Sequence, residues 1–155
     1  MMLKDRLAQD LKDAMRAKDE VRLRTIRSLR AGLTDREIEL RQGGVATLTE
    51  EQEMAVVQKQ AKQRRDAMEQ FRSAGREDLV QREEEELSVI EAYLPRQLTD
   101  AEIREVVRDV VAATGAETMR DMGKVMGPVM ERLRGRAEGR RVQEAVREAL
   151  AGSGA

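Results

Sequence analysis

Residues 121–139 have the sequence DMGKVMGPVMERLRGRAEG, and this stretch decides how the second half of the chain folds. Its apolar residues recur at the spacing of an amphipathic helix. Pro128 lies inside the pattern and lacks the N–H that an interior helical residue donates, so the helix is either kinked there or split in two. The apolar residues are Met122, Val125, Met126, Val129, Met130 and Leu133.

The same stretch combines glycines with cations. Glycine in a helix costs about 0.5–1 kcal/mol relative to alanine. The glycines at 123, 127, 135 and 139 therefore indicate tight helix ends, or a close approach of the backbone to another helix or to a ligand. The surrounding cations suit an anion such as an RNA phosphate. They are Lys124, Arg132, Arg134, Arg136, Arg140 and Arg141.

Helical patterns extend on both sides of this stretch. Thr99 and Glu102 have the spacing of a capping box, in which two side chains satisfy backbone amides at the start of a helix. Apolar residues at helical spacing between 142 and 150 predict a last helix. Pro95 disfavours helical geometry in the residue before it. We therefore expect a helix to end by Leu94 and place a domain boundary there.

The segment before Pro95 carries four helical patterns, over about residues 3–18, 20–40, 49–73 and 76–94. Thr49 and Gln52 form a second capping box. No segment alternates apolar and polar residues over the length of a strand. The sequence therefore predicts an all-α fold, with an elongated four-helix N-terminal domain over residues 1–94 and a compact three-helix C-terminal bundle over residues 95–155. Residues 151–155 are expected to fray.

Charge is unevenly distributed along the chain. The net charge is −1, but residues 1–48 carry +3, residues 49–94 carry −5, and residues 120–147 carry eight cations against four acids. Any RNA contact should avoid the acidic middle segment, because its carboxylates repel the negatively charged phosphates. The chain has no signal peptide pattern and no long apolar run. We therefore expect a cytoplasmic protein with no membrane partner.

The inventory of catalytic side chains is nearly empty. Cysteine and histidine are absent, which removes the usual thiolate nucleophile, the usual general base and the commonest metal ligands. No serine follows a glycine-rich elbow, and the run Glu83–Glu86 is typical of a solvated helix face rather than an acid–base pair. We expect no metal, no cofactor and no catalysis by the chain alone. The serines are Ser28, Ser73, Ser88 and Ser153.

Five motifs resemble the YqeY-like family, whose members are related to the tail of the B subunit of the glutamine-dependent aminoacyl-tRNA amidotransferases. They cover nearly the whole chain, and their joint spacing makes the match specific. The motifs are DMGKVMG at 121–127, RGRAEG at 134–139, AYLP at 92–95, AGREDL at 74–79 and RLRTIR at 22–27.

The resemblance implies a helical N-terminal domain and a three-helix tail. It also implies a role near carbon–nitrogen ligation with glutamine as amido-N-donor, and contact with tRNA, since the tail of the B subunit is the part that meets tRNA. The chain departs from the full B subunit because the kinase-like catalytic module is absent, so a ligase role would need amidotransferase or other protein subunits as partners. The residues carried over by the resemblance are Gly123, Lys124, Gly135, Arg136 and Gly139.

Two interpretations of the glycine–cation cluster stand side by side. In one, Gly123 and Gly127 let helices approach closely, Gly135 and Gly139 end or start helices, and the cations are merely on the surface. In the other, the cluster binds tRNA phosphates, by shape rather than by stacking because aromatic residues are scarce. The candidate RNA-binding residues are Gly123, Lys124, Arg132, Arg134, Gly135, Arg136, Gly139, Arg140 and Arg141.

A second basic group lies in the predicted helix 20–40. It is either a solvated face paired with acids, a second phosphate contact or a docking face for a protein. The rival for the whole chain is a helical protein–protein interaction module with no RNA role. Tyr93, the only tyrosine, is expected to pack the two domains together with its hydroxyl in water. The second basic group consists of Arg22, Arg24, Arg27 and Arg30.

Overall fold

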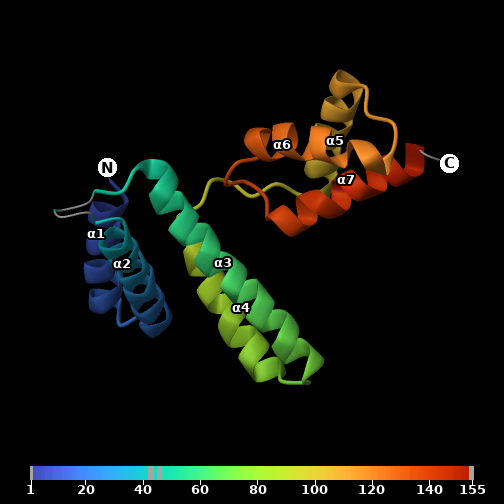
Figure 1. Cartoon of the computed structure of the whole chain (residues 1–155). Helices are drawn as coiled ribbons and strands as arrows, with labels where there is room; N and C mark the ends of the chain where they lie inside the picture. Colours follow the sequence, from blue (N-terminus) through green and yellow to red (C-terminus); the bar gives the residue numbers. More distant parts are fainter. Residues whose placement is uncertain (1, 42–43, 45–46, 154–155) are drawn as a thin grey trace. The chain divides into compact units, whose positions relative to one another are not determined.

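The structure is a computed structural model that describes residues 2–41, 44 and 47–153. These residues form seven α-helices and one 3₁₀ helix and contain no strand, which confirms the all-α prediction (Figure 1). The helices are α1 Leu3–Ala17, α2 Glu20–Leu40, α3 Glu50–Ser73, α4 Glu77–Glu91, α5 Asp100–Thr114, η1 Met119–Asp121, α6 Met122–Arg132 and α7 Gly139–Ser153. The chain divides into two compact units, Met1–Leu94 and Pro95–Ala155, called below the N-terminal and C-terminal units.

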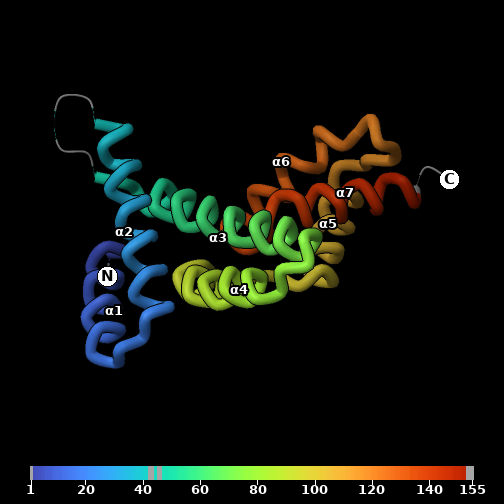
Figure 2. Tube along the Cα trace, turned by 90° about the horizontal axis from the view of Figure 1, so that it is seen from below, coloured from blue at the N-terminus to red at the C-terminus, as the bar shows by residue number. Residues whose placement is uncertain are grey.

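In the N-terminal unit, α3 and α4 form a helical hairpin and lie side by side in both views (Figures 1 and 2). Gly75 makes the turn between them with φ +72°, a left-handed conformation that residues with a Cβ rarely adopt. The capping box of Thr49 and Gln52 at the start of α3 is present as predicted. Between α1 and α2, the Asp19 side chain accepts a hydrogen bond from the Arg22 amide and caps α2.

The core of the N-terminal unit is aliphatic apart from Tyr93. The Tyr93 side chain is buried there, its hydroxyl donates to Asp10, and the Arg6 guanidinium lies 4.6 Å from the ring centroid. The expected position of its hydroxyl in water is therefore wrong, because the Asp10 carboxylate on α1 is within reach. The buried residues of this core are Leu7, Ala14, Ile26, Leu29, Leu33, Leu48, Val57, Ala61, Ile90 and Tyr93.

The C-terminal unit packs α5, α6 and α7 against one another. The capping box of Thr99 and Glu102 starts α5 as predicted. Pro128 lies inside α6, which is one helix and not two, so the alternative of a split helix is excluded. Helix α7 continues through Ser153, so of the tail only residues 154 and 155 lie outside the described residues. The core contains Leu98, Ile103, Val107, Val110, Ala116, Val125, Val129, Leu133, Val142, Ala145, Val146 and Leu150.

Candidate functional site

The loop between α6 and α7 is hydrogen-bonded to the segment before α5, at the start of the C-terminal unit. Gly135 is buried with φ +76°, and its carbonyl accepts a hydrogen bond of 2.9 Å from the Gln97 side chain. The Leu98 amide donates to the carbonyl of Arg136 at 2.8 Å. The left-handed conformation explains why glycine stands at 135. Gly139 is the first residue of α7. The prediction that Gly135 and Gly139 end or start helices is therefore confirmed.

Arg141 makes further hydrogen bonds between the start of α7 and the segment around the start of α5. Its guanidinium donates twice to Asp100 Oδ1, at 2.6 and 2.9 Å, and once to the carbonyl of Leu98 at 3.2 Å. These bonds join the first turn of α7 to the segment that starts α5. Arg141 therefore has a structural role in the candidate cluster, whatever else it contacts.

The remaining arginines of the cluster differ in exposure. Arg136 is half-buried, whereas Arg132, Arg134 and Arg140 are exposed. From the sequence, Arg136 and Arg140 are both expected to be exposed; this is wrong for Arg136, whose carbonyl accepts a hydrogen bond from the Leu98 amide. The exposed cations flank the end of α6 and the start of α7, where an anion could reach them.

Helix α6 presents its glycines to solvent. Gly123 and Gly127 are exposed, and a Cβ added at either position would meet no atom within 4 Å beyond the adjoining backbone. Close packing of two helices therefore does not explain these glycines among the described residues. Gly127 has a local reason, because it precedes Pro128 and a Cβ before proline disfavours helical geometry. For Gly123, the described residues show no such local reason.

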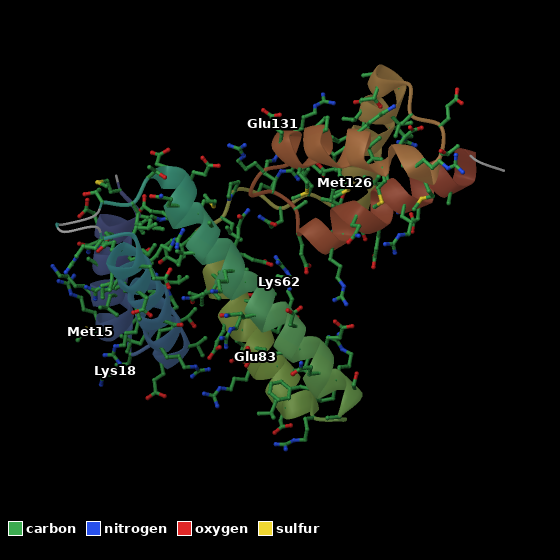
Figure 3. All side chains as sticks on the ribbon, in the orientation of Figure 1. Met15, Lys18, Lys62, Glu83, Met126 and Glu131 are labelled. Atoms are coloured by element: carbon green, nitrogen blue, oxygen red, sulfur yellow. The ribbon has the colours of Figure 1, made fainter. Side chains whose placement is uncertain are left out.

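Lys124 stands between these glycines with its side chain 72% exposed. Its ammonium lies 3.5 Å from a carboxylate oxygen of Asp121, an exposed ion pair of the kind that contributes little to stability. The pKa of Asp121 is lowered, first by hydrogen bonds from the Glu117 and Thr118 amides and less by Lys124. Because Asp121 is held mainly by the backbone, Lys124 can leave it for another anion. Figure 3 labels Met126 and Glu131 on the same helix; Met126 packs against the core.

The predicted second basic group does not form one free face. Arg27 and Arg30 are exposed and Arg22 is half-buried. Arg24 instead donates from Nε to Glu86 Oε1 at 2.6 Å, joining α2 to α4. The Arg24 guanidinium is therefore committed to an ion pair, although its side chain stays 37% exposed.

The expectation that Glu83–Glu86 is wholly solvated is wrong for two of its members. Glu86 is buried and accepts from Arg24 and, at 2.9 Å, from Arg64 of α3. Glu83 accepts from the same Arg64 nitrogen at 3.0 Å, and its place on α4 beside α3 is labelled in Figure 3. Glu84 and Glu85 are exposed, as a solvated run requires. The three helices α2, α3 and α4 are thus joined through one carboxylate.

The described residues give little support to chemistry of other kinds. They contain no group of three or more acidic side chains placed to hold a metal ion, and none of their helices is long and apolar enough to cross a bilayer. Ser28 donates its hydroxyl hydrogen bond to Gln60 on α3 at 3.1 Å, with no general base in that contact. The expectation of no self-sufficient catalysis stays a prediction.

A family model described as "Yqey-like protein" matches residues 4–150, nearly the whole chain. The chain belongs to the YqeY-like family. The resemblance stated from the five motifs is thereby confirmed. Family membership does not by itself carry tRNA binding or ligase activity to this chain.

Fungal proteins are similar to this YqeY-like chain. It is 36% identical over 105 residues to "Altered inheritance of mitochondria protein 41, mitochondrial" of Pyrenophora tritici-repentis (strain Pt-1C-BFP), over 66% of this chain and 56% of that protein. Proteins of the same name from Lachancea thermotolerans and Eremothecium gossypii are 43% and 40% identical over 88 residues, 57% of this chain and 46% of each relative. The chain spans about half the length of these curated relatives. Their name calls them mitochondrial; the cytoplasmic location expected for this chain stays a prediction.

Sequence reasoning missed two parts of the YqeY-like C-terminal unit. Thr118 and Asp121 form a third capping box at η1, and the Thr-x-x-Asp spacing was the signal that could have revealed it. Gln97, which donates to Gly135, gave no such signal, because its partner lies 38 residues away.

Proposed function

We propose that this YqeY-like protein binds tRNA through its phosphates, using the exposed side of α6 and the loop that leads into α7. The main support is the exposed pair Gly123–Lys124: a Cβ at Gly123 would meet no atom of the described residues within 4 Å beyond the adjoining backbone, and Lys124 makes only an exposed ion pair with Asp121. A missing Cβ lets a phosphate oxygen approach the backbone, and the ammonium supplies the charge. Arg132, Arg134 and Arg140 extend the cationic surface.

The chemistry of the surface favours a folded RNA over a flexible single strand. Single-stranded RNA is usually bound by stacking bases on aromatic side chains. The chain has one Phe, one Tyr and no Trp, and Tyr93 is buried in the N-terminal core. Recognition would therefore rest on phosphate positions and shape, which a tRNA offers.

The proposed role is that of an accessory to amide-forming aminoacyl-tRNA metabolism, as a stand-alone homologue of the amidotransferase B-subunit tail. Carbon–nitrogen ligation with glutamine as amido-N-donor would belong to partner subunits, because this chain has no cysteine and the hydroxyl of Ser28 donates to an amide oxygen, not to a general base. The chain would hold the tRNA while those subunits act on it.

Fluorescence anisotropy with labelled tRNA, over a range of salt concentrations, tests the proposal. Contact with about four phosphates gives a slope of log affinity against log salt of about −3.6. The double variant Lys124→Glu and Arg132→Glu should lose at least about tenfold in affinity, since each reversal replaces an attraction by a repulsion. Both side chains are exposed, so the fold should persist.

A matched control reverses two charges on α5, with Arg104→Glu and Arg108→Glu. These side chains are also exposed and the net charge changes by the same amount. An equal loss of affinity in both double variants would mean non-specific attraction and would refute the assignment to α6. No salt-dependent binding of tRNA by the wild type would refute the proposed function.

One observation favours the rival interaction module. Met119 on η1 and Met130 on α6 are 42% and 38% exposed, and flexible methionines suit a surface that adapts to a partner helix. Such a partner would be held mainly by apolar burial, so its affinity would change little with salt. Salt-insensitive capture of a protein with no tRNA binding would favour this function instead.

A further inference from the structure

The N-terminal unit holds a small pocket where α2, α3 and α4 pack against one another. Its volume is about 150 Å³, which is room for about five water molecules. Six of its seven lining residues carry a polar or charged side chain, and the seventh, Ile90, belongs to the core. The residues that matter below are Arg24 and Ser28 of α2, Gln60 and Arg64 of α3, and Glu86 and Ile90 of α4.

Arg24 uses only part of its guanidinium group within the fold. A guanidinium has five N–H donors and often meets a carboxylate with two parallel hydrogen bonds. Arg24 donates only from Nε, to Glu86 Oε1 at 2.6 Å, and its two Nη groups have no partner within the described part of the chain. Its side chain is partly exposed, so these N–H groups are open to a solute.

Arg64 is used in the same partial way. Its acceptors, Glu83 Oε2 and Glu86 Oε2, both lie at Nη1, so Nε and Nη2 have no partner among the described residues. Within the same described residues, every buried side-chain nitrogen or oxygen has a hydrogen-bond partner. The unused N–H groups of both arginines are therefore at surfaces that solvent reaches and are not sealed in the core.

The charges around the pocket favour an anion with a single negative charge. Glu86 lines the pocket too, but it is paired with both arginines, and Arg82 Nε lies 4.0 Å from its Oε1. Together with Glu83, this network holds three guanidinium groups and two carboxylates, a net charge of +1. A cation would be repelled by this excess, and a second negative charge on a guest would exceed it.

We propose that this pocket binds a small carboxylate, whose oxygens accept from the unused N–H groups of Arg24 and Arg64 and whose short alkyl stem lies against Ile90. A carboxylate only accepts hydrogen bonds, and the groups left without a partner here are donors. Gln60 adds another, because its Nε2 donates one hydrogen to the Ser28 carbonyl and has a second. The methylene groups of the arginines and the Ile90 side chain supply apolar surface for the stem.

The pocket belongs to the other unit and needs no RNA, so carboxylate binding there goes beyond the proposed function. The test uses the full chain labelled with ¹³C in its isoleucine methyl groups, at constant ionic strength. Ile90 lines the pocket, whereas Ile38 is about 15 Å further along α2 than Ser28 and Ile103 lies in the C-terminal unit. The probes are propionate, propionamide and propylammonium, which share a short stem and differ in charge.

Propionate should shift the Ile90 methyl signal, leave those of Ile38 and Ile103 in place, and bind at least about tenfold more tightly than propionamide. Propylammonium should bind most weakly, because it meets the arginines. Arg24→Lys keeps the charge and the ion pair with Glu86 but removes the Nη groups, so it should weaken propionate about tenfold and leave propionamide unchanged. Arg27→Lys, exposed on the same helix and outside the pocket lining, is the matched control and should bind as the wild type does.

The remaining outcomes decide against the proposal. No shift of Ile90 with propionate, equal binding of propionate and propionamide, or equal affinity in Arg24→Lys and Arg27→Lys would each overturn it. Should Arg24→Lys not fold, Arg64→Lys replaces it and must also weaken propionate, since Arg64 offers the other unused N–H groups. Tighter binding of methyl phosphate as its dianion would refute the choice of a carboxylate.

A last comparison distinguishes the source of the carboxylate. Glutamate capped at both ends carries a side chain that ends as propionate does. Tighter binding of the capped glutamate than of propionate indicates an acidic side chain of a partner protein, and tighter binding of propionate indicates a free small acid.

Discussion

Removal of the Glu86 carboxylate is the sharpest test of how the N-terminal unit is held together. Glu86 receives hydrogen bonds from Arg24 and Arg64, so Glu86→Ala removes the ion pair between α4 and α2 and one of the two carboxylates that Arg64 of α3 contacts on α4. The Arg24 guanidinium would then have to find water or another partner, while Arg64 would keep its bond to Glu83. We expect the N-terminal unit to lose stability without a change of fold.

The magnitude follows from the exposure of the three side chains. The bond from Arg64 is the better shielded, with side chains 28% and 11% exposed, and a hydrogen bond to a charged group contributes about 1.5–3 kcal/mol. Arg24 is 37% exposed, so its bond is discounted for solvent to about 0.5–1 kcal/mol. Glu86→Ala should therefore cost about 2–4 kcal/mol, and Glu86→Gln, which keeps one acceptor oxygen, about half of that.

Urea unfolding followed by tyrosine fluorescence measures this loss. Tyr93 is the only tyrosine, lies in the core of the N-terminal unit, and is not obscured by tryptophan. Glu84→Gln is the matched control, since Glu84 is an exposed neighbour on α4 and its substitution should change stability by less than about 0.5 kcal/mol. If Glu86→Gln proved as stable as Glu84→Gln, the network would be irrelevant to stability and the reasoning would fail.

Further substitutions test other parts of the structure. The pKa of Tyr93 is raised to about 12, first by burial and next by its bond to Asp10. The stability that the protonated hydroxyl contributes to the N-terminal unit is therefore complete below pH 10 and is lost as the pH rises through 12. Tyr93→Phe should remove this pH dependence in unfolding followed by circular dichroism. Gly135→Ala should destabilise the C-terminal unit by about 1–2 kcal/mol in thermal unfolding, because φ is +76° there. Gly123→Ala should leave thermal stability equal or higher by up to about 1 kcal/mol and weaken tRNA binding; a destabilised variant would show that the fold needs this glycine.

The fold could be predicted because its signals are local. The capping boxes at Thr49 and Thr99 depend on residues three apart, and both helices start where those pairs predict. Gly75 and Gly135 adopt the left-handed backbone that glycine permits, so the helix ends beside them were also visible in the sequence. Helical periodicity then sufficed for the fold class.

The partners and exposure of individual charged and polar side chains could not be predicted, because they depend on residues far away in the sequence. Glu86 is one of four adjacent glutamates, and only the packing of α2, 62 residues away, selects it for Arg24. Arg141 looks like its neighbour Arg140 in sequence, but the fold brings Asp100 to it across 41 residues. Tyr93 likewise finds Asp10 only once α1 has packed. The candidate site was therefore predicted as a region, and its division into structural and exposed cations needed the structure.

The two hydrogen bonds between the segment before α5 and the loop between α6 and α7 have a consequence for the order of folding. They join Gln97 to Gly135 and Leu98 to Arg136. These bonds close about 40 residues of chain, and such closure is entropically costly until α5 and α6 have already docked. We expect them to form after the rate-limiting step, with Gln97→Ala accelerating unfolding far more than it slows folding. Breaking these hydrogen bonds would then determine how fast the C-terminal unit unfolds, and so how long it stays folded.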